Sequence, residues 1–505
     1  MPLFPSFATI RFACTAALEP RFLRTSSPYV KPFFPLALVL GLAACEPAEQ
    51  PLPPTTASGE LVVVTRSSPT TFFANESGDR AGLEHDLVDM FAKELGLKAK
   101  FVAAQQLDIL PGLTQRKAHL AAAGLSITPE REKIVRFAIP YQAVQQRVIY
   151  NTRMKKPKDV ADLVGLHIEV IAGSSYVERL KELRLKFPAL AWHEAKTVES
   201  EALLEKLAMG EIDIAVVDSN IFDIAQKFYP NLKPAFNLGK PDQLAWAFPK
   251  SGEPYLFDKA QSFFARITKD GTLARLIDRY YGHVKRLEEG DVVGIMTKRN
   301  SVLSKYRRLF QQAQDLTGID WRLLAALGYQ ESHWDPLATS PTNVRGLMML
   351  TEDTADLMGV SDRLDVTQNI PAGARYLLNM KDTLPQRIPE PERTWIALAA
   401  YNSGYGHIED ARVLAQRQKL NPDSWSDLKR VLPLLAKSDY HATLKHGYAR
   451  GGETVIFVEN IRTYYDILAR FEQPYQPIFP IDGRAAPKKS KKAKARGLGL
   501  KLPRQ

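Results

Sequence analysis

Glu331 is the residue whose type and position most directly suggest chemistry. Asp320 is a suitable N-cap for a helix that begins just after it, and Leu324, Leu327 and Gly328 lie seven, four and three residues before Glu331. Because residues at these spacings share one helix face, Glu331 lies on an apolar stripe. Burial disfavours the charged carboxylate, so we expect a raised pKa, as a general acid for glycosidic cleavage requires. A buried structural acid would give the same pattern, so this residue alone leaves both interpretations open.

Glu331 lies in the first of four short motifs in the C-terminal half. They are Ala325-Ala-Leu-Gly-Tyr-Gln-Glu331-Ser332-His-Trp-Asp-Pro336, Arg345-Gly-Leu-Met-Met-Leu-Thr351, Ala397-Leu-Ala-Ala-Tyr401-Asn402-Ser-Gly404 and Glu453-Thr-Val-Ile-Phe457-Val-Glu-Asn-Ile461. In this order they resemble the glutamate-serine, Gly-Leu-Met-Gln, Ala-Tyr-Asn-x-Gly and Glu-Thr-x-x-Tyr-Val motifs of the soluble-lytic-transglycosylase (goose-lysozyme-like) family. The resemblance implies a mostly α-helical, lysozyme-like domain.

The resemblance also implies roles for individual residues. Glu331 would be the catalytic acid and base, and Ser332 would orient its carboxyl or the substrate's N-acetyl group. Tyr401 and Asn402 would hydrogen-bond near the transition-state sugar, although core packing would also account for Tyr401. The complete set of implied substrate-binding residues is Ser332, Ser340, Met348, Tyr401 and Asn402.

The number of carboxyl groups bears on the reaction. Hydrolytic glycosidases use two carboxyl groups, whereas these motifs supply one, because Asp335 leads into Pro336 and is better placed to cap a turn. In the family that the motifs resemble, one carboxyl suffices because the muramyl C6 hydroxyl of the substrate is the nucleophile. The expected products are 1,6-anhydro-N-acetylmuramic acid ends, formed without consuming water.

Two positions depart from the family pattern. Met349 stands where most relatives have Gln, so a side-chain amide contact is missing. Phe457 stands where Tyr is usual, so a hydroxyl is missing, which puts a catalytic role for that position in doubt. Neither departure affects the role implied for Glu331.

The elements around these motifs are predicted to be helical. Amphipathic or apolar segments at 301–317, 320–331, 351–358, 369–384, 392–401, 405–417 and 454–470 indicate helices. We therefore expect a catalytic domain over 301–472, preceded by a short polar connector at 285–300.

The N-terminal half has a different pattern. Leu61-Val-Val-Val-Thr65 indicates a buried strand, 82–96 an amphipathic helix, and Ile212-Asp-Ile-Ala-Val-Val217 another strand. Such alternation predicts parallel sheets in α/β lobes. Residues 60–284 resemble the family-3 periplasmic solute-binding proteins, which implies a two-lobed domain that closes on an amino acid.

This second resemblance implies a ligand site between the lobes. Arg131 would bind the ligand's α-carboxylate with help from Ser126 and the backbone of Gly124, for which a guanidinium is well suited. Ser174 and Ser175 would form a second carboxylate contact at a helix N-terminus. Asp218 would pair with the α-ammonium group. Singly, each residue could equally make a surface ion pair or a helix cap.

The N-terminal segment indicates export. Residues 35–44 are apolar but too short to span a bilayer, and they end in Leu42-Ala43-Ala44-Cys45, which resembles a bacterial lipobox. We expect a lipoprotein signal at 1–45, with a lipid on Cys45, and a Pro/Thr-rich linker at 46–59. The resemblance to bacterial lipoproteins implies that Glu46, in place of Asp, favours sorting to the periplasmic face of the outer membrane. A cleaved signal with an incidental cysteine is the alternative.

Charge and composition limit the partners. The 505 residues carry a net charge of +11, and nine Lys or Arg with no acid lie between 484 and 505. This predicts a basic, disordered tail at 473–505, which either solubilises the protein or attracts an anionic polymer or membrane. His333, His407, His441 and His446 do not have metal-ligand spacing, so we expect no metal. We also expect no cofactor and no nucleic-acid partner.

Three functional hypotheses follow. The first is a lytic transglycosylase acting on peptidoglycan glycan strands, modulated by an amino acid or muropeptide in the N-terminal domain. The second is a ligand-sensing protein with a non-catalytic glycan-binding domain, which the intact Glu331-Ser332 pair disfavours. The third is a hydrolytic lysozyme, whose products would be heavier by one water.

Overall fold

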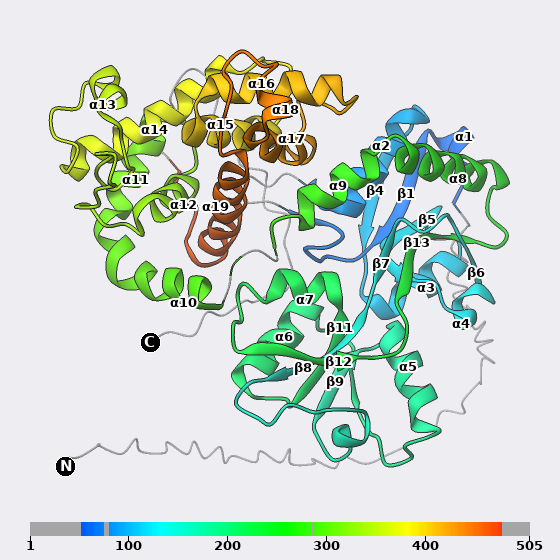
Figure 1. Cartoon of the computed structure of the whole chain (residues 1–505). Helices are drawn as coiled ribbons and strands as arrows, with labels where there is room; N and C mark the ends of the chain where they lie inside the picture. Colours follow the sequence, from blue (N-terminus) through cyan, green and yellow to red (C-terminus); the bar gives the residue numbers. More distant parts are fainter. Residues whose placement is uncertain (1–51, 75–79, 285–286, 288, 477–505) are drawn as a thin grey trace, which may run out of the picture. The chain divides into compact units, whose positions relative to one another are not determined.

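The computed structural model describes residues 52–74, 80–284, 287 and 289–476, which form a two-lobed α/β domain followed by a helical domain (Figure 1). The predicted signal with Cys45, linker residues 46–51 and tail residues 477–505 lie outside the described residues. In the described ranges no helix is both long and apolar enough to cross a bilayer.

The first lobe is built on a mixed sheet in the order β4-β1-β5-β13-β6, with β7 also paired to β13. Its strands are β1 (Glu60–Thr65), β4 (Lys98–Ala103), β5 (Leu120–Ser126), β6 (Val135–Phe137), β7 (Gln142–Val144) and β13 (Asp242–Pro249). Strands β1, β4 and β5 are parallel, as predicted. The expectation of a wholly parallel sheet was wrong, because β13 returns from the second lobe and pairs antiparallel with β5, β6 and β7.

Helices cover both faces of this sheet. On one face Phe91 of α2 (Leu83–Glu94) and Phe263 of α8 (Pro254–Lys269) pack around the buried Trp246, together with α9 (Thr272–Tyr281). On the other face Ile109 and Leu113 of α3 (Gln106–Thr114) are fully buried. The smaller elements are α1 (Thr55–Ser58), β2 (Phe73–Ala74), β3 (Arg80–Ala81) and α4 (Pro129–Glu132).

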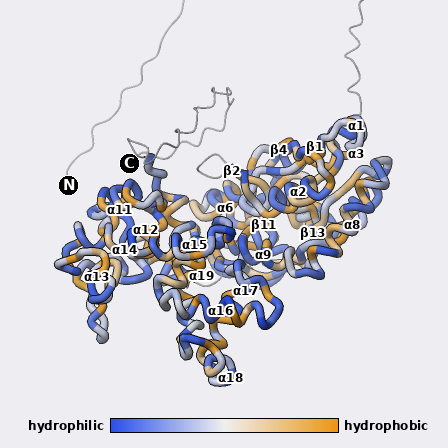
Figure 2. The backbone as a smooth tube through the Cα atoms, turned by 90° about the horizontal axis from the view of Figure 1, so that it is seen from above, coloured by the Kyte–Doolittle hydropathy of each residue, from blue (hydrophilic) through white to orange (hydrophobic). Residues whose placement is uncertain are grey.

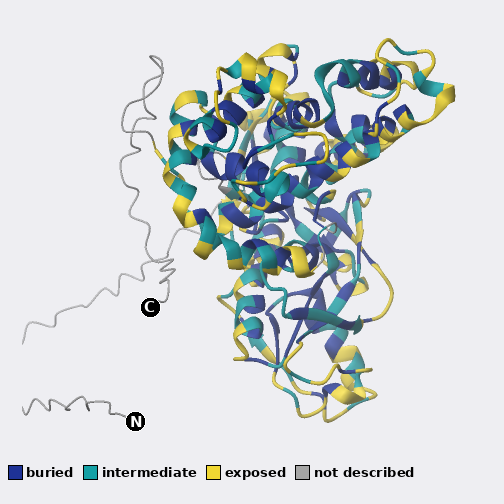
Figure 3. Ribbon diagram, turned by 60° about the vertical axis from the view of Figure 1, so that its left-hand side comes forward, coloured by how far each residue is buried: buried dark blue, intermediate teal, exposed yellow. Residues whose placement is uncertain are grey.

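The second lobe has a five-stranded sheet in the order β10-β9-β11-β8-β12, whose central strands are buried (Figure 3). Its elements are β8 (Gln146–Asn151), a 3-10 turn (Ala161–Leu163), β9 (Ile168–Ile171), α5 (Ser175–Arg184), β10 (His193–Ala195), α6 (Ser200–Met209), β11 (Ile214–Asp218), α7 (Ser219–Ala225) and β12 (Leu232–Asn237). The chain crosses between the lobes twice, from β7 to β8 and from β12 to β13. These two crossings form the hinge of the domain.

The second domain is mostly helical. Its elements are α10 (Glu289–Lys298), a π-helical turn (Arg299–Leu303), α11 (Ser304–Thr317), α12 (Trp321–Ser332), α13 (Glu352–Met358), α14 (Val366–Thr383), α15 (Glu392–Ser403), α16 (Tyr405–Arg417), α17 (Trp425–Val431), a 3-10 turn (Leu432–Ala436), α18 (Ser438–His441) and α19 (Gly451–Phe471). Hydrophobic and hydrophilic residues alternate along these helices (Figure 2). Helix α12 packs against α19 within one core that includes Leu324, Leu327, Ile461 and Leu468.

Three predicted boundaries need correction. The connector at 285–300 contains α10, whose buried Val292 and Ile295 belong to the helical core. The described end of the linker packs on the first lobe, where the buried Thr55 hydrogen-bonds to Glu253. The described start of the tail is also folded, because Tyr475 packs against the helical core. Local polarity suggested linkers at these places. Buried side chains nevertheless hold these segments on the folded domains, and they are spaced too far apart to form a sequence pattern.

Candidate functional site

Glu331 lies in the last turn of α12 with a largely desolvated carboxyl. The Asp320 side chain caps the helix by accepting a hydrogen bond from the Arg322 N–H at 2.9 Å. The residues from Trp321 to Tyr329 are buried, and Glu331 itself is half-buried. Burial raises the pKa of Glu331 to about 8, and its carboxyl has no hydrogen-bond partner among the described residues. The group is therefore protonated at neutral pH and free to donate its proton.

The backbone after Glu331 turns sharply. His333 and Trp334 have φ angles of 53° and 61°, a left-handed conformation that is uncommon for such bulky side chains. The turn is held by two bonds: the indole N–H of Trp334 donates to the Ala325 carbonyl at 2.8 Å, and the Ser332 hydroxyl donates to the Leu347 carbonyl at 2.8 Å. Ser332 therefore joins the end of α12 to the second motif.

The second motif is fixed by buried polar contacts. Gly346 has a φ of 83°, and a Cβ there would lie 2.0 Å from the Arg363 carbonyl oxygen, so only glycine fits. The Met348 N–H donates to Asn369 Oδ1 at 2.7 Å, and the Tyr401 hydroxyl donates to the Met348 carbonyl at 2.9 Å. Met348 is fully buried, so it acts on the site through packing and its carbonyl, not as an accessible side chain as we expected.

The third motif contributes one buried and one exposed group. Burial, followed by the nearby charge of Glu331, raises the pKa of Tyr401 well above its ordinary value, which places the two side chains close together. Asn402 is exposed, and its Oδ1 accepts a hydrogen bond from the Thr454 hydroxyl at 3.0 Å. Its amide N–H groups have no partner within the described part of the chain and are available to a ligand.

Ser340 and the two departures from the family pattern lie differently. The Ser340 hydroxyl accepts from the Val344 N–H at 3.1 Å, a bond within its own loop, and no contact joins it to Glu331 among the described residues. Met349 has a left-handed φ of 46° and is half-buried, next to the segment that Tyr401 holds. Phe457 is buried in α19 with 6% of its surface exposed.

The predicted ligand residues of the N-terminal domain meet between its lobes. Arg131 of the first lobe is 3% exposed, and its guanidinium donates to the Ser126 carbonyl at 3.3 Å and to the Gly173 carbonyl at 3.2 Å. The Ser175 hydroxyl donates to the Ser126 hydroxyl at 3.3 Å across the lobes. Ser174 differs, because its hydroxyl donates to the Ile171 carbonyl at 2.6 Å in its own lobe.

Two expected contacts are already used within the chain. The Gly124 N–H donates to the buried Glu84 at 2.9 Å, so it is not available to a ligand. The Arg131 Nε donates to Glu178 Oε1 at 2.8 Å. Sequence reasoning missed both acids, because each lies far from its partner along the chain.

Asp218 and its surroundings have unused hydrogen-bonding capacity. Asp218 Oδ1, Gln146 Oε1 and Arg66 Nε are buried and have no partner in the described part of the chain. Burial raises the pKa of Asp218 to about 6, against the opposing effect of the Arg66 charge. Buried polar atoms are rarely left unpaired, so this cluster fits a polar ligand.

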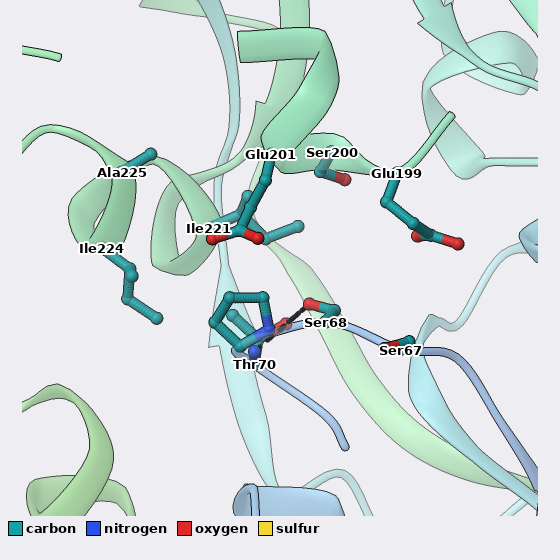
Figure 4. Close-up of a pocket in the computed structure, with 10 residues that line it drawn as sticks. Ser67, Ser68, Thr70, Glu199, Ser200, Glu201, Ile221, Ile224 and Ala225 are labelled. Atoms are coloured by element: carbon teal, nitrogen blue, oxygen red, sulfur yellow. Dashed lines mark hydrogen bonds between the residues drawn. The ribbon is translucent and has the colours of Figure 1, made fainter. Parts of the chain in front are cut away.

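A small pocket of about 20 Å³ lies between the lobes (Figure 4). The loop from Ser67 to Thr70 lines it from the first lobe, and Glu199 and Ser200 at the start of α6 line it from the second. Glu199 Oε2 and Ser200 Oγ are buried without a partner among the residues described. The unpaired polar atoms of the cleft therefore extend beyond Asp218 into this pocket.

No group of His, Cys, Asp and Glu in the described ranges is placed to hold a metal ion.

Comparison with known proteins identifies the family. Residues 61–283 match the bacterial extracellular solute-binding proteins, family 3, and residues 308–423 match the transglycosylase SLT domain. The membrane-bound lytic murein transglycosylase F of Methylobacillus flagellatus is 52% identical over 88% of this chain and 95% of its own length. The chain belongs to the membrane-bound lytic murein transglycosylase F family. The Nitrosospira multiformis member is 50% identical over 88% of this chain and 92% of its own length.

The lytic murein transglycosylase F family combines the two domains described above. Membership confirms the family, the fold class and the lytic transglycosylase activity predicted from the motifs. Among solved structures, an ancestral arginine-binding protein bound to arginine matches with a TM-score of 0.41 and 26% identity, over 44% of this chain and 98% of its own.

One structural residue of the candidate site of this family member was missed from the sequence. Asn369 is completely buried in α14 and bonds to three backbone groups: the Met348 N–H and the carbonyls of Arg345 and Arg363. The available signal was its position at the start of a predicted apolar stripe, which places the side chain in the core. A buried amide needs several hydrogen-bond partners, so a polar contact was to be expected there.

Proposed function

We propose that this lytic transglycosylase cleaves the β-1,4 bond between N-acetylmuramic acid and N-acetylglucosamine in peptidoglycan, with Glu331 as its acid and base. The observation that carries the proposal is the desolvated position of the Glu331 carboxyl in the last turn of α12, without a hydrogen-bond partner among the described residues, which raises its pKa to about 8. Such a group is protonated before the reaction, as a general acid must be, and can be deprotonated near physiological pH.

The proposed reaction balances on one carboxyl. Glu331 donates its proton to the glycosidic oxygen as the bond to the muramyl C1 breaks. The carboxylate then takes the proton of the muramyl C6 hydroxyl, whose oxygen closes the 1,6-anhydro ring on C1. The Asn402 amide N–H groups would bind the sugar, while Ser332 and Tyr401 hold nearby backbone carbonyls through their hydroxyls.

The test is the mass of the products from purified sacculi, with Glu331→Gln as the critical variant. We expect anhydro products, lighter by one water than hydrolysed ones, and a loss of about 10²–10⁴-fold in turnover for the variant. Glu352→Gln, at an exposed acid of the same domain, is the matched control and should keep full activity. Hydrolysed products would establish the lysozyme alternative. Activity retained by Glu331→Gln would exclude Glu331 as the acid.

We also propose that the N-terminal domain binds an amino acid or muropeptide that modulates the enzyme. The support is the group of unpaired buried atoms around Asp218 and the pocket beside it, which a polar ligand would satisfy. Arg131 would contact the ligand's carboxylate and Asp218 its ammonium group. Modulation requires that the ligand bind the open and closed forms with different affinities.

We further propose that the protein acts in the periplasm, anchored to the outer membrane by a lipid on Cys45. The support is the lipobox-like Leu42-Ala43-Ala44-Cys45 sequence and the membrane-bound relatives. Cys45→Ser should move the protein from the membrane fraction to the soluble fraction, which immunoblotting would measure. Continued membrane association of that variant would contradict the anchor and point to the basic tail.

A further inference from the structure

Arg131, the residue proposed to bind a ligand's carboxylate, already binds a carboxylate of this chain. Its Nε lies 2.8 Å from Glu178 Oε1, and the two side chains are only 3% and 28% exposed. Charge-assisted hydrogen bonds of this kind are about twice as strong as neutral ones, and this one is shielded from solvent.

The pair blocks one edge of the planar guanidinium. Arginine has five N–H donors, and here Nε is used by Glu178, one Nη by the Ser126 carbonyl and the other Nη by the Gly173 carbonyl. A carboxylate can bind two adjacent N–H groups in parallel, and Glu178 occupies the edge of the guanidinium that includes Nε. A second carboxylate at Arg131 would also lie beside the negative charge of Glu178.

The pair also joins the two lobes. Arg131 lies in α4 of the first lobe, and Glu178 lies in α5 of the second. Gly173, whose carbonyl binds the same guanidinium, precedes α5. The contact therefore forms only when the lobes are close together, and it holds the cleft closed by an internal carboxylate.

Asp218, in contrast, remains open to a ligand. Its Oδ1 is buried and unpaired within the described ranges, so the closed cleft has a site for an ammonium group while its carboxylate site is occupied. A ligand that brings an ammonium group without an adjacent free carboxylate can occupy this site in the closed cleft while the Arg131–Glu178 pair is intact. The amino terminus of a peptide has this chemistry, and a free amino acid does not.

We propose that Glu178 is a specificity-determining residue that competes with a ligand's α-carboxylate for Arg131. The proposal rests on the proposed ligand binding in this cleft. The apparent affinity for a free amino acid is its intrinsic affinity multiplied by the fraction of molecules in which Arg131 is not paired with Glu178. Ligands whose α-carboxyl is in an amide bond escape this penalty, so the cleft favours peptide amino termini over free amino acids.

The test compares L-alanine with L-alaninamide, which differ at the α-carboxyl, by calorimetry on the full chain. Glu178→Gln should tighten binding of L-alanine about tenfold or more, because one competing charge-assisted bond is lost. It should leave L-alaninamide nearly unchanged. Glu182→Gln is the matched control: it lies on the same helix, is 67% exposed, and pairs with Arg179 at 3.3 Å. Thermal unfolding would verify that each variant is folded.

The outcomes separate this proposal from ligand binding itself. Selective tightening of L-alanine by Glu178→Gln supports the competition. Binding by the wild type that Glu178→Gln leaves unchanged, or tightens equally for both probes, overturns the competition and leaves ligand binding intact. No binding of either probe to the wild type or the variant overturns both.

Discussion

At the scale of single residues, the environment of Glu331 determines both its protonation and the free energy that its ionised form would cost the folded protein. The carboxyl is shifted toward its neutral form by burial at the end of α12, without an ion pair in the described part of the chain. Its neutral form is the stable one in the folded protein. The same burial that prepares the acid therefore makes its ionised form unfavourable to folding.

A pH experiment measures this directly. The pKa of Glu331 is raised to about 8 in the folded state, so the stabilising effect is fully present below the ordinary pKa near 4.5 and is lost as pH rises through about 8. We expect Glu331→Gln to become more stable relative to the wild type as the pH rises from about 4.5 to about 8, measured as the difference in thermal midpoint. The turnover of the wild type should fall as the pH rises through about 8. A constant difference in midpoint would mean that Glu331 is not buried as an acid.

At the scale of elements, the second motif depends on close contact between α14 and Met348. A Cβ at Gly373 would lie 2.7 Å from the Met348 Cβ, closer than atoms can pack without movement. The motif is also bonded to Tyr401 and, through Leu347, to Ser332. Displacing Met348 would therefore disturb both neighbours of Glu331.

Gly373→Ala should lower activity severalfold and destabilise the protein by about 1–3 kcal/mol through overpacking. The matched control is Gly290→Ala in α10, where a Cβ has nothing within 4 Å and should be neutral or stabilising by up to about 1 kcal/mol. Turnover of sacculi and chemical denaturation measure the two effects. Full activity of Gly373→Ala would show that the position of Met348 does not matter for catalysis.

The helices that carry the site could be predicted from sequence, but the contacts between them could not. The period of apolar residues located α12, α16 and α19 to within a few residues, because one buried stripe recurs every turn. The antiparallel β13 and the bonds of Asn369 depend on partners that are distant along the chain. No local pattern encodes such pairings, so motif resemblance supplied the site residues and geometry supplied their partners.

At the scale of the whole described chain, both lobes bond to the helical domain. In the first lobe, Arg279 of α9 donates to Glu392 at 3.1 Å. In the second, Lys227 pairs with Asp466 of α19. His283, which follows α9 of the first lobe, also approaches this carboxylate, with its Nε2 at 2.6 Å. Helix α19 packs against α12, which carries Glu331. Hinge movement would therefore act on contacts of the catalytic helices.

His283 provides a pH-dependent test of this contact. Burial, reinforced by the Arg462 charge, lowers the pKa of His283 to about 4 despite the neighbouring Asp466. A base with a lowered folded pKa stabilises the protein above its ordinary pKa near 6.5, and this stability is lost as pH falls toward 4. His283→Gln should therefore show a smaller fall in thermal midpoint between pH 6.5 and 4 than the wild type. The exposed His193→Gln should behave like the wild type, and equal slopes for all three proteins would contradict the burial of His283.

With the proposed lipid on Cys45, the docking of the linker onto the first lobe would limit the reach of the enzyme. The Leu52 N–H donates to the Arg116 carbonyl at 3.2 Å, and Thr55 is bonded to Glu253. With a lipid on Cys45, only residues 46–51 separate the membrane from the folded protein. A fully extended chain spans at most about 3.5 Å per residue, so residues 46–51 can span at most roughly 20 Å. The enzyme would thus reach only the glycan strands nearest its own membrane. A longer linker would extend this reach without any change in catalysis.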